Sequence, residues 1–423
     1  MRRSALSAGA VAVLALAALH AQPASADAGG RFPPAARLVV ADAAAGSVHV
    51  YAVPSNKKLA TITGRTFADH AGMLPLRDGR VLFVDEAAGE LVALQVGGTP
   101  KVVGTARLPE GEPTHIAADE TGRYAVVAAA GAHDHEEPAE EEPHGTLTVV
   151  DLTTYRPATI EVDSEHPGVV VSGGTVVHRG DGELETFPIA GILANPGAHL
   201  EPTSTLATGE HGHGEAAHAG GLVLGATDAG LDTARVVDGR LQPVRTVPWP
   251  DSGRAYYVRV TGEKLVTYTS DESGDDWQNW KHDAFTVVPD SGRTTTAELG
   301  TGFLFRHGLS DRYAGYVLHR PGGDQVAFVS VKTGQVTTRV QLPPLPGGPV
   351  PGQSPWAAQK RRIALDPSGV LAYVTGGGTG KISVISPDLG KVVGTIATPT
   401  SLEGGGAVTV VVPGHDTVDK VGR

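Results

Sequence analysis

The feature of this sequence that most restricts its fold is a repeated pattern of short apolar segments separated by turns rich in Asp and Gly. Each copy reads as a strand, an Asp/Gly turn, a second strand, a loop and a third strand, and a fourth strand such as KVVGTIAT at Lys391–Thr398 follows. The clearest copies lie at Leu74–Leu94, Ile116–Leu152, Leu309–Val331 and Ile363–Ile385. The pattern recurs about every 45–55 residues, a spacing that predicts the blades of a β-propeller.

The same pattern predicts an all-β chain folded as a single β-propeller of eight blades over residues 27–423, because one blade becomes stable only when it packs between neighbours in a ring. The expected blade starts lie near His70, His115, His166, His213, Tyr256, His307 and Arg362. The segment Leu38–Thr63 holds only three strands, and Ala407–Pro413 (AVTVVVP) is expected to supply the missing strand and close the ring. Seven blades is the alternative, if this last strand joins another blade.

Residues 1–26 have the pattern of a secretory signal peptide. Arg2 and Arg3 precede the apolar run Ala5–Leu19, and Ala24-Ser25-Ala26 forms an A-x-A cleavage site. We therefore expect cleavage after Ala26 and a secreted, extracytoplasmic protein, while the choice between Sec and Tat export stays open. No later apolar run is long enough for a membrane span, so no membrane insertion is expected.

The charge and the lack of cysteine exclude several classes of function. The net charge is −12, and removal of Arg2 and Arg3 with the signal peptide makes it −14. This charge argues against nucleic acid or an anionic lipid surface as a partner and is compatible with cation binding. With no cysteine, disulfides and thiolate metal sites are ruled out.

Propeller topology predicts that the histidines gather at one end of the ring. The innermost strand of each blade starts at one face, and the loop between the second and third strands returns to that face. His70, His115, His166 and His307 lie in segments that lead into innermost strands, and EHGHGEAAHAGG at Glu210–Gly221 is another such segment. The acidic stretch AHDHEEPAEEEPHG at Ala132–Gly145 lies between second and third strands, as does WQNWKH at Trp277–His282.

Imidazole and carboxylate groups at one channel mouth predict a transition-metal site. Zinc takes four ligands of this kind, although imidazole also suits copper and nickel, so the donors alone do not fix the metal. The candidates on the rigid inner strands are His70, His115 and His166, with Asp69 and His218 as additions. The candidates on flexible loops, expected to bind more weakly, are His133, His135, His144, His211 and His213.

Several segments resemble the AztD family of zinc metallochaperones. They are DHAG at Asp69–Gly72, THIAADETGRYAVV at Thr114–Val127, the HDHEEP loop, Glu165–Glu185 and HGHGEAAHAGG. The resemblance implies an extracytoplasmic or periplasmic protein that binds zinc, and we further expect a monomer that catalyses no reaction. It also implies that the protein hands zinc to the solute-binding protein of a zinc ABC importer by direct contact.

Two other readings remain open at this point. Propellers also carry hydrolases and lactonases, and a hydrolytic site here would need an open metal position and a base such as Glu112. The chain could also be a generic secreted propeller that acts as an interaction scaffold without metal, in which case the histidine-rich stretches are solvated surface loops.

Overall fold

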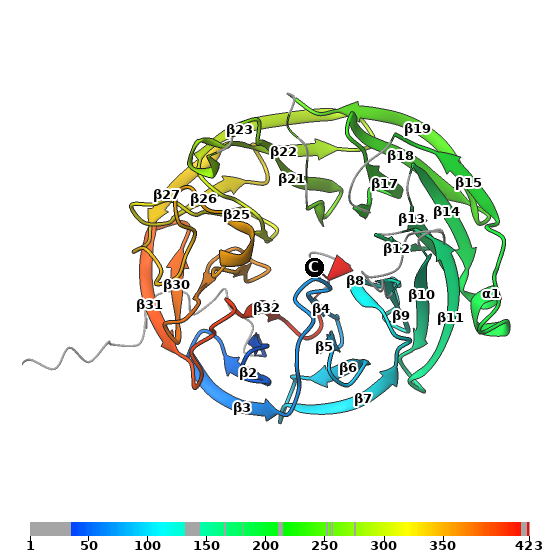
Figure 1. The fold of residues 1–423 in the computed structure, drawn as a ribbon, viewed down its shortest axis with the longest axis horizontal. Helices are drawn as coiled ribbons and strands as arrows, with labels where there is room; N and C mark the ends of the chain where they lie inside the picture. Colours follow the sequence, from blue (N-terminus) through cyan, green and yellow to red (C-terminus); the bar gives the residue numbers. More distant parts are fainter. Residues whose placement is uncertain are drawn as a thin grey trace, which may run out of the picture.

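The computed structural model describes residues 35–131, 144–164, 166–180, 182–209, 215–250, 253, 255, 257–274, 276–415 and 421–422; for residues 144, 421 and 422 it describes the backbone only. Within these residues the chain forms eight antiparallel sheets arranged as the blades of one ring (Figure 1). The predicted eight-bladed propeller is therefore confirmed, and the alternative of seven blades is wrong.

The first four blades, with strands in order from the centre outward, have the following bounds. Blade 1 contains β32 (Ala407–Val411), β1 (Arg37–Asp42), β2 (Ser47–Ala52) and β3 (Lys57–Thr63). Blade 2 contains β4 (Met73–Pro75), β5 (Arg80–Asp85), β6 (Glu90–Gln95) and β7 (Lys101–Arg107). Blade 3 contains β8 (Glu112–Ala118), β9 (Tyr124–Ala130), β10 (His144–Asp151) and β11 (Arg156–Asp163). Blade 4 contains β12 (Gly168–Ser172), β13 (Thr175–Arg179), β14 (Glu183–Pro188) and β15 (Ser204–Ala207).

The other four blades follow the same plan. Blade 5 contains β16 (Ala216–Ala219), β17 (Leu222–Ala226), β18 (Gly230–Val237) and β19 (Arg240–Pro248). Blade 6 contains β20 (Arg259–Thr261), β21 (Lys264–Asp271), β22 (Lys281–Val288) and β23 (Arg293–Thr301). Blade 7 contains β24 (His307–Leu309), β25 (Tyr313–Leu318), β26 (Gln325–Ser330) and β27 (Val336–Gln341). Blade 8 contains β28 (Ile363–Leu365), β29 (Ala372–Gly376), β30 (Lys381–Ser386) and β31 (Lys391–Ala397).

Three short helical segments and one additional strand complete the described structure. They are α1 (Ile189–Ala194), η1 (Trp277–Asn279), η2 (Trp356–Ala358) and β33 (Val421–Gly422). None of the helices in this part of the chain has the length and apolar character that a membrane crossing requires.

The ring closes by pairing the two ends of the chain, as the sequence predicts. β32 lies antiparallel to β1, with Leu38 opposite Val410 and Val40 opposite Val408. Blade 1 is thus assembled from residues more than 300 positions apart in sequence. β33 was not predicted; it pairs with the inner edge of β8, so the end of the chain lies at the centre of the ring (Figure 1).

The Asp/Gly turns have a clear physical basis. In the turn between β8 and β9 the Asp119 carboxylate accepts a hydrogen bond from the backbone N–H of Tyr124 at 2.7 Å. Gly122 takes a φ of +69°, a left-handed conformation that costs glycine little. The turn between β28 and β29 repeats the arrangement with Asp366 and Gly369, which has a φ of +70°. These residues fix the hairpin between the first and second strands of a blade.

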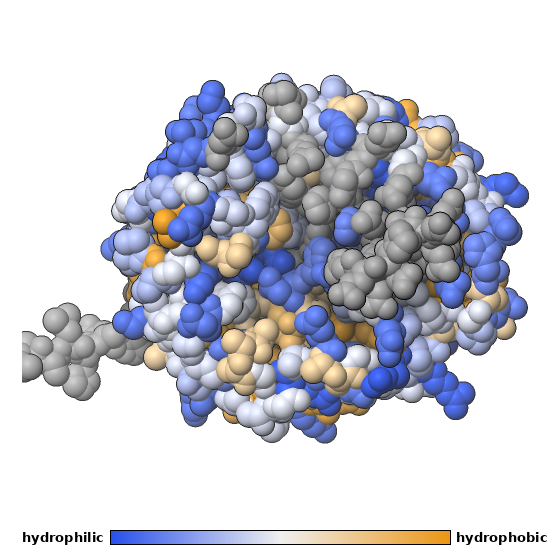
Figure 2. Space-filling view, in the orientation of Figure 1, coloured by the Kyte–Doolittle hydropathy of each residue, from blue (hydrophilic) through white to orange (hydrophobic). Residues whose placement is uncertain are grey.

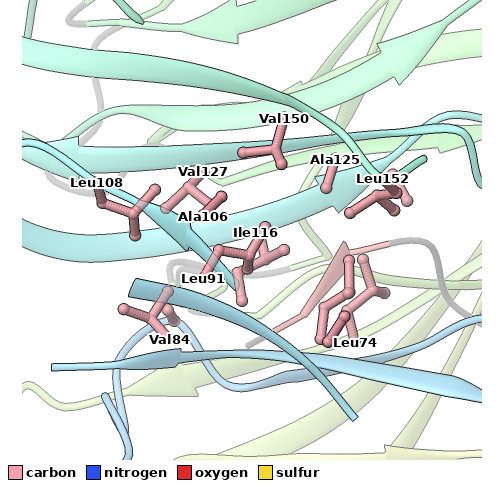
Figure 3. Packing of buried hydrophobic residues seen from close by; sticks show 14 of the residues in the cluster. Leu74, Val84, Leu91, Ala106, Leu108, Ile116, Ala125, Val127, Val150 and Leu152 are labelled. Carbon is pink, nitrogen blue, oxygen red and sulfur yellow. The ribbon is translucent and has the colours of Figure 1, made fainter. Parts of the chain in front are cut away.

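The core is a series of apolar layers between neighbouring blades. Between blades 2 and 3, Leu74, Val84 and Leu91 face Ile116 and Val127, and all five side chains are buried (Figure 3). Burial of apolar surface contributes about 25 cal/mol to stability for each Å². Because the apolar layers lie between blades, each blade is stabilised mainly by contact with its neighbours. The result is a rigid ring that holds the beginnings of the innermost strands in fixed positions.

Candidate functional site

The segments that lead into the innermost strands meet at one end of the ring, which we call the entry face. Asp69, before β4, forms ion pairs with Arg306, before β24, at 3.3 Å and with Arg362, before β28, at 2.6 Å. His70 lies 3.2 Å from Glu112, the first residue of β8. Residues of blades 2, 3, 7 and 8 are therefore in direct contact across the mouth of the ring.

The Asp69 carboxylate is held by the two guanidinium groups. Burial raises the pKa of this carboxyl, but Arg306 and Arg362 outweigh that effect and lower the pKa to about 2. Asp69 is therefore ionised at neutral pH, and its charge is already paired with two arginines. This pairing makes it a poorer metal ligand than the sequence alone suggested, because a metal ion would have to displace a guanidinium.

His70 and Glu112 form the imidazole–carboxylate pair nearest to solvent in this region. The His70 side chain is 31% exposed and that of Glu112 is 65% exposed, and His70 Nδ1 lies 3.2 Å from Glu112 Oε1. Both side chains are accessible and of the type that zinc prefers. The structure thus brings together one predicted ligand, His70, and a carboxylate that the sequence analysis considered only as a catalytic base.

His115 and His166 lie in adjacent blades; His115 is buried and His166 is half-buried. His115, in β8, is 2% exposed, and its Nδ1 donates a hydrogen bond to the carbonyl oxygen of Pro167 at 3.0 Å. His166 precedes that proline, two residues before β12. Because a carbonyl oxygen accepts only, the His115 bond requires the proton on Nδ1 and leaves Nε2 as the ring nitrogen with a lone pair.

His218 lies toward the opposite end of the ring. It is the third residue of β16, and its Nε2 lies 3.4 Å from the hydroxyl of Ser172, the last residue of β12. Its Nδ1 lies 3.7 Å from Glu120, in the turn after β8. These partners belong to strand ends remote from the entry face, so the structure does not bring His218 together with His70.

The loop histidines of the two histidine-rich stretches lie outside the described residues or are described by their backbone alone. His133, His135, His211 and His213 are among the residues not described, and for His144 only the backbone is described, as the first residue of β10. The described ends of these stretches are informative. Gly131 follows β9, and Gly209 accepts a hydrogen bond from Arg179, at the end of β13, at 2.9 Å. Both stretches therefore start from the entry face, as the topology predicts.

A pocket of about 690 Å³ opens beside these residues on the entry face. It is lined on one side by Asp69, His70, Glu86 and Glu112, and on another by Phe305, Arg306, Trp356 and Arg362. Trp356 packs edge-on against Phe305, with ring centroids 5.3 Å apart, and against Phe303 at 5.1 Å. Figure 2 shows hydrophilic and hydrophobic residues next to one another around the centre of the face it views.

No group of three or more His, Asp or Glu residues suited to a metal ion occurs within the part of the chain that the structure describes. His70 and Glu112 supply two donors, so a complete site would need a further ligand.

The sequence analysis did not single out Arg306 or Phe305, and it noted Arg362 only as a blade start. The available signal was that each of these residues lies one or two positions before an innermost strand.

The fold and the entry-face pocket define an eight-bladed β-propeller with a histidine–carboxylate pair and two buried arginines at its mouth. The sequence matches no protein-family model and no curated protein. Among solved structures, the chain is similar to apo AztD from Citrobacter koseri, with a TM-score of 0.65 and 15% identity over 92% of this chain and all of that one. A second structure of Citrobacter koseri AztD gives the same TM-score and identity over 90% of this chain.

The fold is also shared with the dihydro-heme d1 dehydrogenase NirN in complex with DHE. There the TM-score is 0.59 with 16% identity, over 91% of this chain and 77% of the NirN chain. At such identities the similarity establishes the propeller fold, which both a dehydrogenase and AztD adopt. The structural similarity to AztD agrees with the resemblance seen in the sequence.

Proposed function

We propose that this protein is an extracytoplasmic zinc metallochaperone that binds zinc at the entry face and delivers it to the solute-binding protein of a zinc ABC importer. In this proposal residues 1–26 direct export and are removed, residues 27–423 form the propeller, and the protein acts as a monomer without catalysing a reaction. The observation that carries the proposal is the common location of the donors. His70 and Glu112 lie at the face from which both histidine-rich stretches start.

The proposed route has two stages. The loop histidines at residues 132–145 and 210–214 capture zinc from solution, because several imidazoles close in sequence can share one ion. His70, in the turn that leads into β4, and Glu112, the first residue of β8, then provide donors next to the inner strands. A partner that docks on the entry face can replace such ligands one at a time, since both side chains are exposed to solvent.

Zinc titration of purified protein, followed by calorimetry and elemental analysis, tests the proposal. We expect at least one zinc for each chain. His70→Ala is expected to weaken the tightest site about tenfold or more, as loss of one ligand commonly does. A His133/His135/His144 triple alanine variant is expected to lose weaker sites or transfer rate. His415→Ala is the matched control, because His415 follows β32 at the far end of the ring, 4.0 Å from Asp311.

The pH dependence follows from the ligand chemistry. Imidazole binds zinc only when neutral, so affinity is expected to fall as the pH drops through about 6.5. Absence of stoichiometric zinc from the wild type, or unchanged affinity and transfer in both variants, would contradict the proposal. Transfer is measured by mixing zinc-loaded protein with an apo solute-binding protein in the presence of a chelator that intercepts free zinc.

A further inference from the structure

The entry-face pocket contains a second chemical environment that the zinc proposal does not use. At its base, Arg306 and Arg362 both face the Asp69 carboxylate, and their side chains are only 12% and 7% exposed. Two largely buried guanidinium groups thus share one carboxylate, whose side chain is 46% exposed. Among the described residues these two positive charges share one acidic partner, an arrangement that is costly where water is mostly excluded.

The hydrogen bonds of Arg362 lead to the same conclusion. One terminal nitrogen contacts the Gln359 carbonyl and the other contacts Asp69 at 2.6 Å. Its Nε is buried and has no hydrogen-bond partner in the described part of the chain. Burial lowers the pKa of this guanidinium and the neighbouring Arg306 lowers it further, while Asp69 raises it. A second anion beside Arg362 would therefore stabilise the charge of its guanidinium group.

The walls of the pocket are apolar and aromatic. Phe305 and Trp356 line it, and Trp356 remains 36% exposed although three aromatic rings contact it. The Arg306 guanidinium carbon lies 5.7 Å from the centre of the Phe305 ring and 5.6 Å from that of Tyr257. Cationic and aromatic groups thus adjoin within one cavity, an arrangement that suits a planar anion with an apolar body.

The rim of the pocket restricts the charge of the ligand. Glu86 and Glu112 line the pocket, and Glu112 is paired with His70. These carboxylates disfavour a ligand with two negative charges such as phosphate or a dicarboxylate. A single carboxylate can still approach the arginines, which hydrogen-bond it with planar geometry.

We propose that this pocket binds a small organic monocarboxylate, whose carboxylate pairs with Arg306 and Arg362 and whose apolar body packs on Phe305 and Trp356. Binding there does not require zinc, because neither arginine is a metal ligand, but the proposed zinc donors His70 and Glu112 line the same pocket. It is a ligand site on the face proposed for zinc delivery, so its occupancy would change the surface that a partner meets.

The test uses benzoate as the probe and calorimetry in the presence of EDTA, so that the outcome does not depend on zinc. Saturable benzoate binding is expected, together with a change in tryptophan fluorescence, because Trp356 lines the pocket. Benzamide, which has the same shape without the charge, is expected to bind at least about tenfold more weakly, and phosphate likewise. Equal binding of benzoate and benzamide, or no saturable binding of benzoate, would overturn the proposal.

Variants locate the site. Arg306→Lys and Trp356→Leu are each expected to weaken benzoate binding about tenfold, since lysine lacks the planar pair of donors and leucine removes the indole surface. Asp69→Asn is expected to strengthen binding several-fold, because it removes the carboxylate that competes for both arginines. Arg235→Gln, which alters an exposed arginine paired with Asp290, is the control and should bind as the wild type does.

Circular dichroism and thermal melting establish that each variant is folded. Trp356 is partly exposed, so its variant provides a result even if Arg306→Lys does not fold. Weaker binding in Asp69→Asn, or wild-type binding in folded Trp356→Leu, would place the benzoate elsewhere and refute the proposal.

Discussion

Replacement of His282 by glutamine is expected to remove a defined part of the pH dependence of stability. His282, in β22, is 1% exposed, and both ring nitrogens have partners inside the protein. Nε2 donates to the Gly302 carbonyl at 2.8 Å, so the neutral ring accepts a hydrogen bond from the Ser270 hydroxyl at Nδ1, also at 2.8 Å. A proton added at Nδ1 would force the Ser270 hydroxyl to accept this hydrogen bond and would place a charge in the core.

The magnitude follows from the pKa. Burial lowers the pKa of His282 from 6.5 to about 4; the Gly302 hydrogen bond opposes this effect, and Arg320 adds to it. The unfolded chain therefore takes up a proton near pH 6.5 that the folded protein takes up only near pH 4, so stability falls as the pH falls through this interval. The full loss is about 3.4 kcal/mol, of which about 2 kcal/mol occurs between pH 7.5 and pH 5.

Urea unfolding followed by tryptophan fluorescence at pH 7.5, 6 and 5, with EDTA present, measures this contribution. His282→Gln is expected to cost about 1 kcal/mol at pH 7.5 through altered hydrogen bonds, and to lose about 2 kcal/mol less than the wild type on going to pH 5. His199→Gln is the control, because His199 is exposed. Equal pH dependence in the wild type and His282→Gln would refute the buried, neutral state of this ring.

Two further predictions concern the ring itself. Gly104 and Gly394 occupy matching positions in the outermost strands KVVGTAR and KVVGTIA. A Cβ atom added at Gly104 would lie 2.1 Å from the Tyr155 ring, whereas one added at Gly394 would contact only Val384, at 3.8 Å. Gly104→Ala is therefore expected to lower the free energy of unfolding by about 1–3 kcal/mol and Gly394→Ala by less than about 0.5 kcal/mol, measured by urea unfolding; equal effects would contradict the packing. Deletion of residues 407–423 removes β32 and is expected to abolish the cooperative thermal transition. Deletion of residues 416–423 keeps β32 and is expected to preserve the transition. A cooperative thermal transition in the longer deletion would show that ring closure is dispensable.

The architecture could be predicted well because its signals are local. The Asp119–Gly122 and Asp366–Gly369 turns carry their own hydrogen bonds, and short apolar segments between the turns mark the strands. The N-terminal blade has only three strands of its own, which leaves the backbone hydrogen-bonding groups at its inner edge unpaired. This incomplete blade predicted that a strand from elsewhere in the chain, β32, covers the edge. β33 carried no such signal, since two residues are too few for a periodic pattern.

The site was predicted less completely. Topology placed His70, His115 and His166 at the entry face, but the same rule does not say how deep a side chain lies or with what it pairs. His115 donates to the Pro167 carbonyl, Asp69 is held by two arginines, and His218 lies near the far end of its strand. These outcomes depend on positions within a strand, where a shift of one or two residues changes the partner.

The sequence by itself determined that this chain is a cysteine-free, acidic propeller with histidines near its blade entries, because composition and a period of about 50 residues are properties of the chain alone. Only the tertiary structure decided that Asp69, Arg306 and Arg362, separated by up to 293 positions, meet in one pocket. The physical reason is ring closure: contacts across the mouth depend on the radius and the blade order, and no local pattern encodes either.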